Sequence, residues 1–253
     1  LAYLLVSRQI NFDPEGKIFI GELALDGSIR PVFGVMPIAL MARTLGIKEL
    51  YVPEENAQEA GLVDGIDIYP LKNLVEAYEH FSKRKMLRPI DPVILPPIKQ
   101  EYEHDFAYIK DQDFAKRALE VTAAGNHNIL MSGPPGSGKT LLARALVSIL
   151  PSMEKEEILE TTRIFSVAGL ISHKEPLIRT RPFRSPHHTS SAAALVGGGS
   201  VPKPGEITLS HKGVLFLDEF PEFNRDVLES LRQPLEDGTV TVSRVKGSLT
   251  FPA

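Results

Sequence analysis

Residues 133 to 140 have the types and the spacing needed to hold a polyphosphate. They read Gly-Pro-Pro-Gly-Ser-Gly-Lys-Thr and match the pattern G-x-x-x-x-G-K-[ST] at every fixed position. In a loop of this kind, backbone N–H groups and the positive end of the following helix point at the phosphates. Lys139 would reach the β- and γ-phosphates, and the hydroxyl of Thr140 would ligate Mg²⁺. The loop therefore predicts a site for a nucleoside triphosphate and its magnesium ion.

Two adjacent carboxylates, Asp218 and Glu219, could complete the chemistry of such a site. They follow the apolar run 214–217, which predicts a fully buried parallel strand with both carboxylates at its carboxyl end. Asp218 would hold Mg²⁺, usually through water, and Glu219 would orient the water that attacks the γ-phosphate. An apolar run ending in Asp-Glu is common in proteins, but after a phosphate loop in the same chain it indicates an ATPase. We expect ATP to contact Gly133, Pro134, Pro135, Gly136, Ser137, Gly138, Lys139, Thr140 and Leu141.

The elements that must position these residues are those of an α/β fold. Asn128 to Ser132 predicts a short buried strand before the phosphate loop, and Leu141 to Leu150 predicts a helix after it. Upstream, Phe114 to Ala123 predicts a helix that either walls the nucleotide base or packs against the sheet. Downstream we expect a helix from Arg225 to Leu235 and a hairpin arm from Thr239 to Arg244.

The first 87 residues predict a separate α+β module. Asp26-Gly27 lies between two apolar runs and is a strong hairpin signal. Met36 to Leu45 and Leu71 to Lys85 predict helices, and Glu49 to Pro53 predicts a strand. Residues 88–101 carry prolines at 89, 92, 96 and 97, which hold a chain extended, so they predict a linker to a second domain over 102–253.

Composition narrows the class of protein. The chain has 253 residues and a net charge of -4, so it shows no overall basic character that would indicate nucleic acid binding. It has no cysteine, which excludes disulfides and thiolate metal sites and fits the cytoplasmic localisation that we expect. No apolar run approaches the roughly 18 residues that span a bilayer, so we expect no membrane partner. The apolar start and the strand-like end both predict a fragment that is open at each end.

Between the two site motifs, residues 171–213 form a locally basic stretch. The stretch contains six Lys or Arg residues and two Glu residues, which gives it a local net charge of +4. The stretch either grips a polyanionic or polypeptide client with a flexible, glycine-rich loop, or is a solvated surface insertion. It also contains an expected strand at Ala192 to Val196 and four histidines, His173, His187, His188 and His211. Adjacent histidines on an extended segment point to opposite sides, so a metal site there is disfavoured.

Several segments together resemble the magnesium-chelatase-like AAA+ ATPases, and within them the ComM and YifB family. The likeness extends over nearly the whole chain and includes the phosphate loop and residues 214–219. Three further segments carry it: Arg181-Pro182-Phe183-Arg184-Ser185-Pro186-His187-His188, Gly197-Gly198-Gly199 with Pro204-Gly205-Glu206-Ile207, and Leu231-Arg232-Gln233-Pro234-Leu235-Glu236-Asp237-Gly238.

The resemblance implies a P-loop AAA+ core with a parallel αβα sheet, assembled as a hexameric homo-oligomer with ATP between subunits. For ComM-like members it implies ATP-driven movement on branched DNA during recombination of transforming DNA, whereas chelatase relatives remodel a protein client. A nucleotide-dependent scaffold is a third alternative. The family's sensors and trans-acting arginine are expected after Ala253, so Arg232 and Arg225 remain as residues that could act on a neighbouring subunit's nucleotide.

The N-terminal module resembles the Lon-protease domain, which has the ribosomal S5 domain 2-like fold. Lon-type proteases carry a catalytic Lys on the helix that corresponds to Met36 to Leu45, and that helix contains no Lys here. The segment that would carry the nucleophilic Ser falls before Leu1. A dyad without its base cannot activate a serine, so we expect no peptidase activity from this module. Asp111 stands where the family usually has Gly, which concerns the base pocket alone.

Overall fold

A computed structural model describes residues 1–91, 102–171, 177–198, 203–244 and 247–253. The chain divides into two compact units, 1–96 with 165–177 and 97–164 with 178–253. The grouping of residues 165–177 with the first unit has no signal in the sequence. Their attachment is a hydrogen bond from the Ser166 hydroxyl to the buried carboxylate of Glu59, which also accepts from the backbone of Met36.

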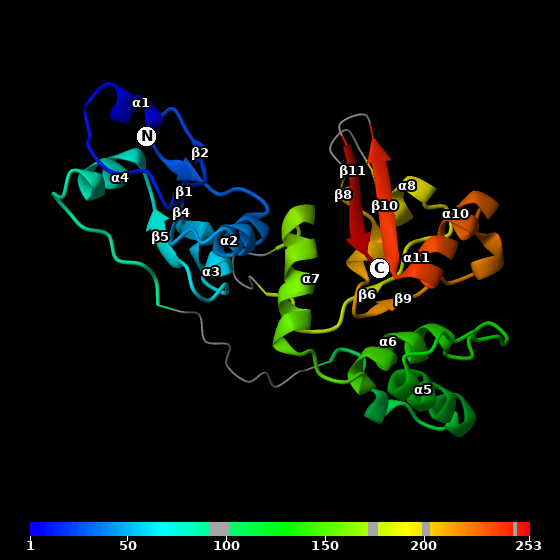
Figure 1. The fold of residues 1–253 in the computed structure, drawn as a ribbon. Helices are drawn as coiled ribbons and strands as arrows, with labels where there is room; N and C mark the ends of the chain where they lie inside the picture. The colour runs from blue at the N-terminus through cyan, green and yellow to red at the C-terminus, as the bar shows by residue number, and fades with distance from the viewer. Residues whose placement is uncertain (92–101, 172–176, 199–202, 245–246) are drawn as a thin grey trace. The chain divides into compact units, whose positions relative to one another are not determined.

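The first unit is built on a three-stranded parallel sheet in the order β1, β4, β5 (Figure 1). The strands are β1 (Lys17–Phe19), β4 (Glu49–Pro53) and β5 (Asp67–Leu71). Leu50, Tyr51 and Val52 of the central strand are fully buried, as expected for a strand with both neighbours paired. The hairpin predicted at Asp26-Gly27 is confirmed by the antiparallel pair β2 (Glu22–Leu23) and β3 (Ile29–Arg30).

Four helices complete the first unit. They are α1 (Ala2–Val6), α2 (Val35–Thr44), α3 (Ala57–Ala60) and α4 (Leu74–Phe81), and the 3₁₀ turn Glu54–Asn56 precedes α3. The helix predicted over Leu71 to Lys85 is shorter than expected at both ends. Leu71 ends β5, and Asn73 caps α4 by accepting a hydrogen bond from the Glu76 N–H, so the helix begins only after the cap.

The second unit begins with α5 (Asp113–Gly125), α6 (Lys139–Ile149) and most of α7 (Lys155–Ala168), whose residues from 165 on belong to the first unit. A short 3₁₀ turn, Phe106–Tyr108, precedes α5. Leu119 and Ala123 of α5 pack against Leu142 and Leu146 of α6. This favours the packing role that the sequence left open for the Phe114 to Ala123 helix.

The strand predicted at Asn128 to Ser132 is wrong. The segment has no strand partner within the part of the chain that the structure describes, although Ile129 and Met131 pack against the α5–α6 cluster. Leu130, between them, is 85% exposed. The alternation is that of an extended chain, but a strand also requires a neighbour to accept its backbone hydrogen bonds.

A pair of parallel strands lies beyond α7. β6 (Phe183–Arg184) pairs with β9 (Val214–Leu215). The predicted four-residue buried strand 214–217 is therefore only two residues long, and its side chains are half-buried. Val214 packs on one apolar cluster, whereas Leu215 and Leu217 pack on another. A mixed α/β fold with parallel strands is confirmed in both units.

The remaining elements form a second apolar cluster. α8 (Ala192–Val196), α9 (Glu206–Leu209), α10 (Arg225–Ser230) and the hairpin of β10 (Thr239–Arg244) with β11 (Gly247–Pro252) supply buried residues that include Leu195, Ile207, Val227 and Val240 (Figure 1). The hairpin arm is confirmed. The strand expected at 192–196 is wrong, because Ser191 caps a helix there by accepting from the Ala194 N–H.

Two further elements differ from expectation. The single helix predicted from Arg225 to Leu235 is divided at Leu231 into α10 and α11 (Arg232–Asp237), and the turn Phe220–Glu222 precedes it. Gly197–Gly198 forms β7, paired with β8 (Lys203–Pro204). A Cβ on Gly197 or Gly205 would collide with facing backbone, so these glycines serve close packing rather than the flexibility we expected. None of the helices in the described ranges is long and apolar enough to cross a membrane.

Candidate functional site

The phosphate loop has the backbone conformation that its glycines predict. Gly136 and Gly138 have φ values of 76° and 81°, in the left-handed region that other residues rarely adopt. Gly138 is also the N-cap of α6, which begins at Lys139, two residues earlier than predicted. The loop therefore leads directly into a helix N-terminus, whose first N–H groups have no intrahelical acceptor and favour an anion.

The side chain of Lys139 folds back over this loop. Its Nζ donates to the carbonyl oxygens of Gly133 and Pro134 at 2.9 Å each and lies 3.4 Å from the Ser137 hydroxyl. The ammonium group thus lies at the loop itself, held by carbonyl groups that are weaker acceptors than a phosphate would be. A bound polyphosphate can replace these contacts with stronger ones.

Thr140 and Asp218, the two predicted magnesium ligands, lie together in the structure. The Thr140 hydroxyl donates to Asp218 Oδ2 at 3.2 Å across 78 residues of sequence. The second carboxylate oxygen, Oδ1, accepts from the Glu219 N–H at 3.0 Å. A hydroxyl beside a carboxylate is a pair of hard oxygen ligands, which suits Mg²⁺ with its remaining water.

Glu219 lies at a sharp bend of the chain and faces a histidine. Its φ is 55°, and its Oε2 is 3.0 Å from Nδ1 of His188. The register of the parallel strands explains the contact, because Phe183 pairs with Val214, 31 residues away, and His188 and Glu219 are separated by the same 31 residues. The sequence shows both residues, but their proximity follows only from a strand register that it does not reveal.

Two other predicted site residues lie at the surface. Leu141 is 47% exposed on the first turn of α6. Arg232 lies on α11, where its Nε contacts Glu236 Oε1 at 2.9 Å, one helical turn away. Within the described ranges it makes no hydrogen bond or ion pair with the phosphate loop. A role for Arg232 in catalysis therefore stays a prediction.

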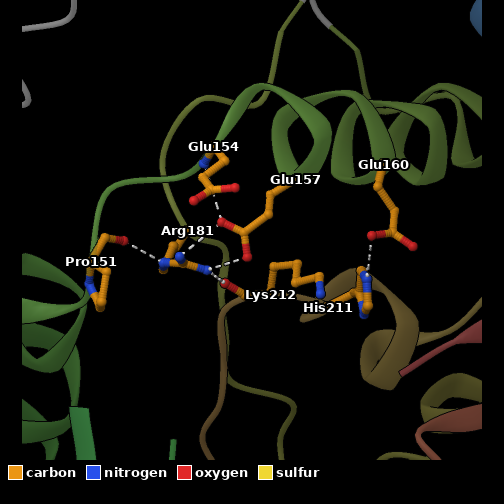
Figure 2. A network of polar contacts seen from close by, with 7 residues as sticks. All are labelled: Pro151, Glu154, Glu157, Glu160, Arg181, His211 and Lys212. Carbon is orange, nitrogen blue, oxygen red and sulfur yellow. Dashed lines mark hydrogen bonds and ion pairs between the residues drawn. The ribbon is translucent and has the colours of Figure 1, made fainter. Parts of the chain in front are cut away.

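Two arginines of the basic stretch are engaged inside the second unit. Arg181 donates to the carbonyl oxygens of Pro151 at 2.6 Å and Lys212 at 2.8 Å, and pairs with Glu157 at 3.0 Å (Figure 2). Arg184 forms a two-pronged pair with Glu206 at 2.6 and 2.7 Å. These guanidinium groups join segments of the fold, which weakens the argument that they grip a client; Lys174 of the same stretch lies outside the described residues.

The contact between Arg181 and Glu157 has an electrostatic signature. Burial by itself would raise the pKa of the Glu157 carboxyl, but hydrogen bonds from the Glu154 N–H and from Arg181 outweigh it and lower the pKa. The carboxylate is therefore stabilised in its charged form. Glu157 lies on the first turns of α7, so this pair fixes that end of the helix to the segment before β6 (Figure 2).

The histidines considered as metal ligands have other contacts. His211 is buried, with Nε2 3.3 Å from Glu160 Oε2 on α7 (Figure 2) and Nδ1 3.1 Å from the carbonyl oxygen of Ala253. The rings of His187 and His188 lie against each other with centroids 4.1 Å apart and planes tilted by 35°. His173 lies outside the described residues.

Comparisons with known proteins identify the family of the chain. A family model described as "Magnesium chelatase, subunit ChlI" matches residues 105–253, and one described as "Subunit ChlI of Mg-chelatase" matches residues 1–56.

Three curated relatives are similar to this chain in sequence. The competence protein ComM of Haemophilus influenzae is 44% identical over 93% of this chain and 46% of its own length. The protein YifB of Escherichia coli is 40% identical over 100% of this chain and 49% of its own. The Mycobacterium tuberculosis protein Rv2897c is 45% identical over 94% and 47%. The chain thus spans about half the length of these relatives.

Proposed function

Because this chain belongs to the magnesium chelatase ChlI family, in its ComM and YifB branch, we propose that it is the nucleotide-binding part of an AAA+ motor that hydrolyses ATP. The single observation that carries the proposal is the hydrogen bond between Thr140 and Asp218. It joins the loop suited to phosphate with the carboxylates suited to Mg²⁺ and water.

Each residue of the site has a definite task in this proposal. The N–H groups at the start of α6 and the ammonium of Lys139 bind and orient the triphosphate. Thr140 and Asp218 would hold Mg²⁺, which supplies charge neutralisation on the phosphates when bound. Glu219 orients a water molecule and accepts its proton, help that is typically worth about 10² to 10⁴ in rate.

The finer proposal concerns the fold. In this proposal residues 102–253 are the AAA+ core, and residues 1–87 are a Lon-protease-like domain without peptidase activity, joined to the core by residues 88–101. Support for the second point is again the helix α2, whose ten residues include no Lys. We further propose that the protein acts in the cytoplasm and forms a hexameric ring. In such a ring, a trans-acting group from a neighbouring subunit would complete the site, because no arginine is bound at the phosphate loop among the described residues.

The proposed work of the motor is remodelling of DNA, including branch migration during recombination. It is supported by the likeness to a relative named as a competence protein and by the basic stretch. The second candidate is remodelling of a protein client, as in chelatases. It is favoured by the internal ion pairs of Arg181 and Arg184, which remove two of the six cations of that stretch from DNA binding.

Branch migration of a labelled four-way DNA junction by the full-length protein tests these proposals. Wild type, Lys139→Ala and Glu219→Gln are compared, with ATP turnover measured in the same samples. ATP-dependent product from wild type and none from Glu219→Gln supports the DNA role. Absence of DNA binding at low salt defeats it and leaves the protein client. Absence of ATP turnover from wild type would defeat the ATPase proposal itself, whereas equal turnover by wild type and Glu219→Gln would defeat the role given to Glu219.

A further inference from the structure

The contact between His188 and Glu219 joins the proposed catalytic site to the segment that follows β6. Nδ1 of His188 and Oε2 of Glu219 are 3.0 Å apart, a hydrogen-bond distance. Glu219 has a side chain that is 63% exposed, whereas that of His188 is only 28% exposed. The more buried side chain of the pair thus contacts the more exposed one.

His188 is itself held by its surroundings. Its ring lies against that of His187, with centroids 4.1 Å apart and the planes tilted by 35°, and its centroid is 6.5 Å from that of Phe223 in a T-shaped arrangement. His187 is fixed in turn by Thr189, whose hydroxyl lies 2.9 Å from His187 Nδ1. The chain turns at this point because the Ser190 N–H donates to the His187 carbonyl at 2.9 Å. The imidazole thus has a defined position at the end of β6.

The backbone of Glu219 makes such support necessary. Its left-handed φ of 55° and the bond from its N–H to Asp218 Oδ1 fix the main chain, but neither restrains the side chain. When His188 Nδ1–H donates to Oε2, the other carboxylate oxygen stays available to a water molecule. A general base that is held in place needs no reorientation before it accepts a proton.

On the basis of the proposed ATPase function, we propose that His188 is a positioning residue for the hydrolytic Glu219. It touches neither nucleotide nor water in this role. It acts by fixing the Glu219 carboxylate, so its loss slows the chemical step and leaves ATP binding unchanged.

Steady-state ATP turnover and nucleotide affinity of the full-length protein test this role. His188→Ala is expected to lower kcat by about tenfold, part of the 10² to 10⁴ that a general base contributes, with the KM for ATP changed less than about twofold. His188→Asn places an amide N–H near the position of Nδ1, so it should recover much of the lost turnover. Rescue by Asn separates positioning from a general structural role. Thermal melts of both variants check that the fold is intact.

A double-mutant cycle gives the deciding comparison. In the Glu219→Gln background, His188→Ala should cause no further loss, because the group it positions is already gone. Unchanged or raised turnover in His188→Ala, while Glu219→Gln is inactive, would overturn the inference and leave the ATPase proposal standing. If wild type showed no ATP turnover, the ATPase proposal would fail first; full turnover in Glu219→Gln would instead remove Glu219 from the chemical step and overturn the role of His188 with it.

Discussion

The hydroxyl of Thr140 donates to Asp218 Oδ2 at 3.2 Å, which brings the phosphate loop to the end of β9. Thr140 lies on the first turn of α6 and Asp218 is 78 residues later. The two predicted magnesium ligands thus lie within hydrogen-bond distance of each other. Coordination of Mg²⁺ by both residues would replace this hydrogen bond.

Asp218→Asn should weaken nucleotide binding only when magnesium is present. The amide keeps the shape of the side chain but lacks the negative charge that attracts a hydrated divalent cation. We expect affinity for MgATP to fall by about tenfold, in the range seen when groups around a metal are altered. Affinity for ATP in excess EDTA should be unchanged. Titration of a fluorescent ATP analogue with and without Mg²⁺ checks this, and an equal loss in both conditions contradicts it.

Lys139→Ala should abolish the stabilisation of the protein by ATP while leaving the unliganded fold unchanged. The Lys139 ammonium contacts the exposed carbonyls of Gly133 and Pro134 and the half-buried Ser137 hydroxyl, all of them loop groups. A ligand at 100 times its Kd stabilises a fold by about 2.7 kcal/mol, which thermal melts resolve easily. Wild type should show this shift with MgATP and Lys139→Ala should not. A lower melting temperature of unliganded Lys139→Ala would show instead that the contacts are structural.

Arg181→Ala should destabilise the second unit far more than Arg232→Ala. The Arg181 side chain is 14% exposed and donates hydrogen bonds to Glu157 and to two carbonyl groups. Removal of the guanidinium leaves these partly buried acceptors without a donor. We expect a loss of about 2 to 4 kcal/mol in the free energy of unfolding. Arg232 is 73% exposed, and its pair with Glu236 is worth at most about 0.5 kcal/mol.

Urea denaturation followed by far-UV circular dichroism makes this comparison, since the sequence has no tryptophan. Arg181→Lys should fall between wild type and Arg181→Ala, because an ammonium cannot make the forked contact of a guanidinium. Similar losses for Arg181→Ala and Arg232→Ala would show that the network of Figure 2 contributes little.

The stability of the first unit should fall as pH falls below about 6.5 because of His80. Burial lowers the pKa of His80 from its ordinary value of 6.5, and Lys17 adds to the effect while Glu49 opposes it. His80 Nδ1 accepts from the Leu87 N–H at 3.0 Å, and Nε2 is 3.1 Å from the Tyr51 hydroxyl, which donates to Glu49. The neutral ring satisfies this chain of hydrogen bonds, and a proton on Nδ1 would break it.

The sign follows from the lowered pKa. The unfolded chain takes up the proton first, so the contribution of His80 is complete above pH 6.5 and is lost as pH falls through the folded pKa. His80→Phe removes the titrating group and should flatten the decline between pH 7.5 and about 5. Urea midpoints across this range make the measurement, and parallel curves for the two proteins would disprove the assignment.

Local patterns in the sequence were sufficient for the chemistry of the candidate site. A phosphate loop depends on glycines that adopt positive φ and on a helix that starts at a fixed position, and both properties are local. Gly136, Gly138 and α6 accordingly lie where the pattern places them. The hairpin arm of β10 was predicted for the same reason, since alternation and a neighbouring turn lie within a few residues.

The two strand predictions that failed did so for different reasons, one distant and one local. Residues 128–132 have the alternation of a strand but find no strand beside them in the described chain. Residues 192–196 are apolar and small, a composition that fits strand or helix, and the cap by Ser191 decided for the helix. The positive charge of residues 171–213 was visible, but not that Glu157 and Glu206 neutralise two of its arginines.

The sequence by itself determined which residues could bind a triphosphate and Mg²⁺ and which carboxylate could activate water. Only the tertiary structure decided that Thr140 meets Asp218 and that His188 meets Glu219. The second contact arises from the parallel register of β6 and β9, where an offset of 31 residues continues from Phe183 and Val214 to His188 and Glu219. A strand's register is set by packing and backbone pairing across the fold, and no local pattern specifies it.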